Sequence, residues 1–181
     1  MKIGVYKFRR RYSAAQVIVD IVSAGALILQ VFVITAHIEW IAYFDRVNRT
    51  DKVLHNEWYP LLIWAVLAVL VFGFSFFLIL KKKKEPTRYN ISKNNVVKYC
   101  NIIDTCISCV RLMILIILFD ISSTHSYLIL FQEFQFPSIS LVSVLIIIAV
   151  LVLTKFRLEA ISDVEQERQE REEKKKTIIE D

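Results

Sequence analysis

The sequence predicts an all-α, polytopic membrane protein: a bundle of four transmembrane helices with both termini cytoplasmic and a charged, helical C-terminal tail. Of the 181 residues, 55% are hydrophobic, and the mean hydropathy of +0.47 is above that of ordinary soluble proteins. Four apolar stretches are long enough to cross the hydrocarbon core, which takes roughly 20 helical residues. Lysine and arginine cluster in alternate connecting segments, which predicts the orientation of the bundle.

The predicted membrane domain covers residues 1–154, and the predicted spans are residues 12–38, 58–80, 98–119 and 137–154. The second and fourth spans contain no charged residue, whereas the first contains Asp20 and the third contains Asp104 and Arg111. Pro137 suits the first turn of the fourth helix.

Two connecting segments and the tail differ in character from the spans. The segment 37–58 is expected to be a loop with its aromatic residues at the membrane surface. The segment 120–137 is too apolar for a solvated loop, so it is expected to lie at the interface or to fold back into the bundle. The tail, residues 155–181, has acidic and basic residues four apart, which favours a solvated helix.

Basic residues predict the side of the membrane on which each segment lies. The N-terminal segment, the middle loop and the start of the tail each contain a cluster of them, whereas the other two loops contain only Arg46, Arg49 and Lys52. Short loops rich in lysine and arginine stay cytoplasmic, so we expect both termini inside, in the plasma membrane. The net charge of +5 then indicates attraction to anionic lipid and predicts no nucleic-acid partner.

Spans one and three each carry polar residues three and four apart, which places them on one helical face. Asp20 and Asp104 lie at similar depth, and the long side chain of Arg111 leans back toward them. In one interpretation these residues form a hydrogen-bonded seam, within this chain or with a partner's helix. In the other they form a proton or cation path in which one carboxyl group is protonated or holds a cation. The predicted polar core comprises Gln16, Asp20, Gln30, Asn101, Asp104, Ser108 and Arg111.

The spacing of Cys106 and Cys109 is that of a thiol–disulfide exchange pair. Small four-helix membrane oxidoreductases use such pairs, but they need a second, outer pair, and the predicted outer loops contain no cysteine. The helical positions also turn Cys106 away from Asp104 and Arg111. The alternative is that both cysteines are small packing residues.

All three histidines, His37, His55 and His125, lie in or beside the predicted outer loops. Imidazole and carboxylate groups could bind a divalent metal there or respond to pH. Histidine and glutamate two residues apart do not share a helical face, so we assign no metal ligands and no cofactor. The N-R-T sequence at 48–50 is an N-glycosylation acceptor in a eukaryotic secretory membrane.

The chain contains no nucleotide-binding, metalloprotease or hydrolase motif, so we expect no enzyme. The first hypothesis is a non-enzymatic accessory or regulatory membrane component that meets lipid and either a membrane-protein partner or a second copy of itself. The alternative is a small proton- or cation-coupled transporter that uses Asp20 and Asp104. Four short spans enclose little room for a path, so a homodimer would be expected. A membrane thiol–disulfide oxidoreductase ranks third.

Overall fold

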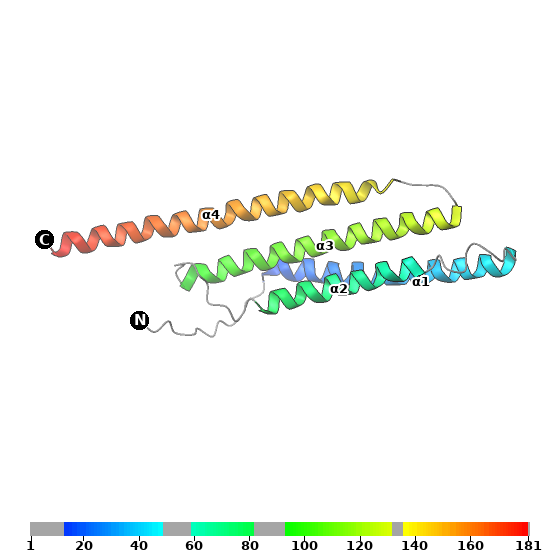
Figure 1. The fold of residues 1–181 in the computed structure, drawn as a ribbon. Coiled ribbons are helices and arrows are strands. Elements are labelled where there is room, and N and C mark those ends of the chain that lie inside the picture. The colour runs from blue at the N-terminus through cyan, green and yellow to red at the C-terminus, as the bar shows by residue number, and fades with distance from the viewer. Residues whose placement is uncertain (1–12, 49–58, 82–92, 132–135, 181) are drawn as a thin grey trace.

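The computed structural model describes residues 13–48, 59–81, 93–131 and 136–180, and this part of the chain forms four long helices that run side by side (Figure 1). The helices are α1 (Ala14–Asn48), α2 (Tyr59–Lys81), α3 (Lys93–Phe131) and α4 (Ser138–Glu180). Each contains a segment long and apolar enough to cross a membrane: Ala14–Tyr43, Tyr59–Ile79, Val97–Ile129 and Ser138–Ile161. The all-helical prediction is confirmed, and the orientation of the termini stays a prediction.

Helices α1 and α3 are longer than the spans that the sequence predicts. Helix α1 continues past residue 38 to Asn48, so the segment expected to be a loop begins as helix. Helix α3 continues through Asp120 to Phe131, although the sequence predicts the span to end before that acid. No glycine or proline interrupts residues 120–131. The carboxylate of Asp120 is hydrogen-bonded to α4, so it does not have to reach water to be solvated.

Helix α3 lies at the centre of the arrangement. Within the described residues it contacts each of the other three helices, α1 and α2 contact each other, and α4 contacts α3 alone. Figure 1 shows α3 between α4 and the pair formed by α1 and α2. Helix α4 is therefore attached to the bundle along a single neighbour.

The buried side chains of α3 recur at alternating steps of four and three residues, which is the heptad spacing of aligned, left-handed helix packing. Helix α1 repeats the seven-residue step in its buried Gln16, Ser23 and Gln30. In α1 and α3, one stripe is thus directed inward over much of the helix. The α3 stripe consists of Asp104, Ser108, Arg111, Leu115, Leu118 and Ser122, and the buried Ser126 follows four residues later.

The interior is unusually polar, and the surface is apolar. Buried apolar side chains of the described residues form two small clusters, one around Ile34 and Leu61 and one around Ala68 and Leu115. Many large apolar side chains point outward, for example Ile28, which is 70% exposed, and Leu145, which is 66% exposed. A continuous apolar surface around a polar interior suits a molecule surrounded by lipid.

Helix α4 is a single helix of 43 residues that runs from its apolar segment into the charged tail, which is helical as predicted. At about 1.5 Å per residue it is roughly 65 Å long, about twice the hydrocarbon thickness of a bilayer. Lys155 and Glu159 pair at 3.6 Å on its surface, and such an exposed pair contributes little stability. The helix therefore reaches well beyond any membrane that its apolar segment crosses.

Candidate functional site

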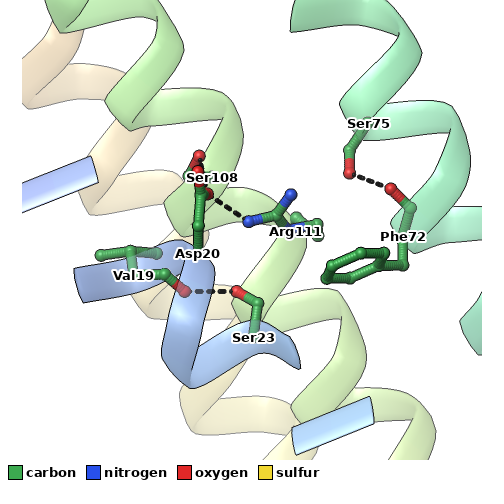
Figure 2. A network of polar contacts seen from close by, with 7 residues as sticks. All are labelled: Val19, Asp20, Ser23, Phe72, Ser75, Ser108 and Arg111. Atoms are coloured by element: carbon green, nitrogen blue, oxygen red, sulfur yellow. Dashed lines mark hydrogen bonds and ion pairs between the residues drawn. The ribbon is translucent and has the colours of Figure 1, made fainter. Parts of the chain in front are cut away.

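The polar centre of the molecule is an ion pair between α1 and α3 (Figure 2). A terminal guanidinium nitrogen of Arg111 donates to Oδ1 of Asp20, and the hydroxyl of Ser108 donates to the same oxygen at 2.7 Å. Arg111 is 1% exposed and the side chain of Asp20 is 28% exposed. Opposite charges in contact, with a further hydrogen bond to the acid, are the arrangement that makes buried charge tolerable.

Arg111 also contacts α2, in addition to its pair with α1. Figure 2 shows Arg111 beside the ring of Phe72 on α2. The guanidinium carbon lies 4.7 Å from the centre of that ring, which is a cation–π distance. One side chain therefore links α1, α2 and α3. Phe72 cannot be predicted from the sequence, because an apolar span does not reveal which of its faces meets a cation.

The other residues of the predicted polar core lie along the same seam. Asp104 is buried on the stripe that carries Ser108, and Asn101 is half-buried one turn before Asp104. The carbonyl of Asn101 accepts a hydrogen bond from the hydroxyl of Thr105 at 2.7 Å. The structure thus pairs Arg111 with Asp20 and places Asp104 nearer the start of α3.

Gln16 and Gln30 are buried on α1 on either side of Asp20, with exposed fractions of 1% and 0%. Within the described part of the chain, neither side-chain amide forms a hydrogen bond, and Nε of Arg111 and Nε1 of Trp64 also lack one. An unsatisfied polar group in an apolar interior costs several kcal/mol. The α1 face of the seam therefore carries unused capacity for hydrogen bonding.

A second polar region lies where α1, α3 and the beginning of α4 meet. Asp120 of α3 accepts two hydrogen bonds from Ser140, one from the backbone N–H at 2.8 Å and one from the hydroxyl at 2.7 Å. An acid on one helix thus caps the first turn of another, where the helix dipole favours negative charge. Beside it lies a partly open cavity of about 520 Å³, here called the α4 cap cavity. Its polar and aromatic lining residues include His37, Asp120, Ser123, Thr124, Tyr127 and Phe136.

Sequence reasoning did not identify the contact between Asp120 and Ser140. The sequence contains half of the signal, because Pro-Ser before an apolar run is typical of a helix start. The position of Asp120 beside that helix start depends on how α4 packs along α3, and no local sequence pattern predicts that packing.

The three histidines of the hypothetical outer-face metal or pH site are not brought together in the described structure. His37 lines the α4 cap cavity, His125 is half-buried on α3 outside the cavity lining, and His55 falls outside the described residues, as does Thr50 of the N-R-T sequence. Where residues are described, no group of three histidine, cysteine, aspartate or glutamate side chains is placed to hold a metal ion.

The three cysteines all lie on α3, and none of them forms a disulfide. Cys100 is exposed, whereas Cys106 and Cys109 are half-buried. Two thiols three residues apart on a helix are near each other, and α3 is continuous through both cysteines.

No protein-family model matches this chain, and neither the curated proteins nor the solved structures contain a significant match to it.

Proposed function

We propose that this protein is a non-enzymatic accessory component of a membrane, which binds a partner membrane protein along α4. The observation that supports the proposal most directly is that α4 contacts α3 alone among the described helices. Only 6% of its apolar segment is buried, compared with 28% for α3. In this proposal both termini are cytoplasmic, so the charged part of α4 extends into the cytoplasm.

The polar centre supports a scaffolding role. The charge of Asp20 is matched by Arg111 inside the chain, so the pair has no need of a further ion to be neutral. Through Phe72 the same arginine reaches α2, which makes α1, α2 and α3 one unit. This unit holds α4 in place from one side and leaves the opposite side of α4 available.

The available side of α4 has the spacing of a helix-packing surface. Leu141, Leu145, Ile148 and Val152 are all exposed, and they recur at steps of four, three and four residues. This is the pattern by which one helix fits into the grooves of another. A transmembrane helix of the partner is therefore the occupant that we propose, with the charged end of α4 as a second contact.

A photo-crosslinking amino acid at position 145 in the full-length protein, in its native membrane, tests the proposal. A matched control is the same substitution at Leu70 of α2, which is 60% exposed. We expect one partner protein to be crosslinked from position 145 and not from position 70, and mass spectrometry after gentle-detergent purification should recover it stoichiometrically. Crosslinks to lipid alone from both positions would reject the proposal, and crosslinks to a second copy would favour the transporter below.

A proton- or cation-coupled transporter is the second candidate, and the unsatisfied polar atoms favour it. Gln16 and Gln30 are 14 residues apart, about 21 Å along α1, with Asp20 between them. Together with Nε of Arg111 they form a line of groups able to hydrogen-bond water within the seam. In proteoliposomes this candidate predicts proton or cation flux that is lost in Asp104→Asn and retained in Glu159→Gln, an exposed control on α4. Absence of flux with the wild-type protein would reject it.

A further inference from the structure

The α4 cap cavity has the size and composition of a ligand site, and it has no part in the proposed accessory function. Its volume of about 520 Å³ falls within the range of roughly 300–1,000 Å³ typical of small-molecule sites. Side chains from three parts of the chain meet there: His37 from α1, Asp120 and Ser123 from α3, and Phe136 just before α4. The cavity therefore exists only when α4 is docked on α3.

Asp120 is the one acidic side chain among the described residues that line this cavity, and none of them is a lysine or arginine. Both hydrogen bonds from Ser140 are accepted by Oδ2 of Asp120, and the residue also lines the cavity. The start of α4 supplies only about half a positive charge. Among the described residues, no lysine or arginine pairs with Asp120, whereas Asp20 is paired with Arg111. An acid between apolar helices without a full counter-charge favours a cationic ligand.

The remaining lining residues fit an organic cation with N–H donors. The hydroxyls of Ser123 and Thr124 and an imidazole nitrogen of His37 can accept hydrogen bonds, and Phe136 adds an aromatic ring to the lining. A primary ammonium group carries three N–H donors and one positive charge. Metal ions are less suited, because no three ligating side chains gather here among the described residues.

We propose that the α4 cap cavity binds the primary ammonium group of a small amine, with Asp120 as its counter-ion. The group could come from a soluble amine or from the headgroup of an aminophospholipid. The cavity is partly open, and Asp120 lies nine residues before Ile129, about 13 Å from the end of the apolar segment of α3. Binding would tie α1, α3 and the first turn of α4 together.

The experiment uses the full-length protein in nanodiscs of phosphatidylcholine, with ethanolamine as the soluble probe and calorimetry as the readout. A parallel sample contains phosphatidylethanolamine, whose retention is measured by native mass spectrometry. The key variant is Asp120→Asn, because asparagine still accepts the hydrogen bonds from Ser140 but carries no charge. Glu159→Gln makes the same change in net charge on the exposed surface of α4.

We expect Asp120→Asn to weaken amine binding at least tenfold, and Glu159→Gln to leave it unchanged. Phe136→Leu, which keeps both hydrogen bonds between Asp120 and Ser140, should weaken it by a smaller factor and so guards against misfolding of the first variant. Saturable ethanolamine binding identifies a soluble amine, whereas selective retention of phosphatidylethanolamine alone identifies a lipid headgroup. If the wild-type protein shows neither, or if Asp120→Asn binds as the wild type does, the proposal is wrong.

Discussion

Arg111 of α3 and Asp20 of α1 form an ion pair in the interior of the helix bundle, and Arg111 at the same time covers the ring of Phe72 on α2. This relationship makes the two charges interdependent. If either is removed alone, the other is left in an apolar environment without a counter-charge, whereas the removal of both leaves no charge to solvate.

The first prediction concerns that pair. Arg111→Met alone should destabilise the protein by about 3 kcal/mol, because Asp20 then keeps only the hydrogen bond from Ser108. The double variant Asp20→Leu with Arg111→Met should lie within about 1 kcal/mol of the wild type. Reversible unfolding in mixed micelles measures both values. A double variant as unstable as the single one would show that the pair is needed for packing beyond its charge.

The second prediction concerns the unsatisfied amide of Gln30. Methionine has nearly the same shape without the polar atoms, so Gln30→Met should stabilise the protein by about 1 to 2 kcal/mol. The contrasting variant is Ser108→Ala, which removes a hydrogen bond that is made and should destabilise by about 1 kcal/mol. A loss of stability in Gln30→Met would mean that the amide is hydrogen-bonded in the membrane, which would strengthen the transporter candidate.

The third prediction concerns the cap at the beginning of α4. Asp120→Ala removes the one oxygen that accepts both hydrogen bonds from Ser140 and should expose the first turn of α4 to hydrogen exchange, at a cost of about 1 to 2 kcal/mol. Asp120→Asn should keep most of the protection. Hydrogen exchange measured by mass spectrometry on peptides from residues 138–145 distinguishes the two. Equal protection in all three proteins would show that α3 holds α4 without this contact.

The sequence predicts much of the seam because helices have a fixed period. Residues 16, 20, 23 and 30 of one span and 104, 108 and 111 of another must each fall on one face, and polar faces in a membrane seek one another. That Arg111 meets an acid of this seam follows from that reasoning. The choice of Asp20 over Asp104 does not, since it depends on the offset between α1 and α3.

The features that the sequence does not predict depend on which helices are neighbours. Phe72 lies in a span that is apolar on every face, and α4 contacts α3 alone although its segment Ser138–Ile161 carries exposed apolar residues on several faces. The sequence predicts Asp120 beyond the third span, because a charged residue usually marks the end of a transmembrane span. It lies within a continuous helix, since the first turn of α4 provides its hydrogen-bond donors.

The fourth prediction separates the accessory and transporter candidates from the third-ranked redox hypothesis. On α3, Cys100 is exposed whereas Cys106 and Cys109 are half-buried, so a membrane-permeant maleimide should modify Cys100 first. The double variant Cys106→Ser with Cys109→Ser should keep normal protein levels and normal partner crosslinking from position 145, because neither thiol belongs to the polar seam or to the exposed face of α4. Cys100→Ser is the matched control. If the double variant alone lost function at normal abundance, thiol chemistry at this pair would replace both higher-ranked proposals.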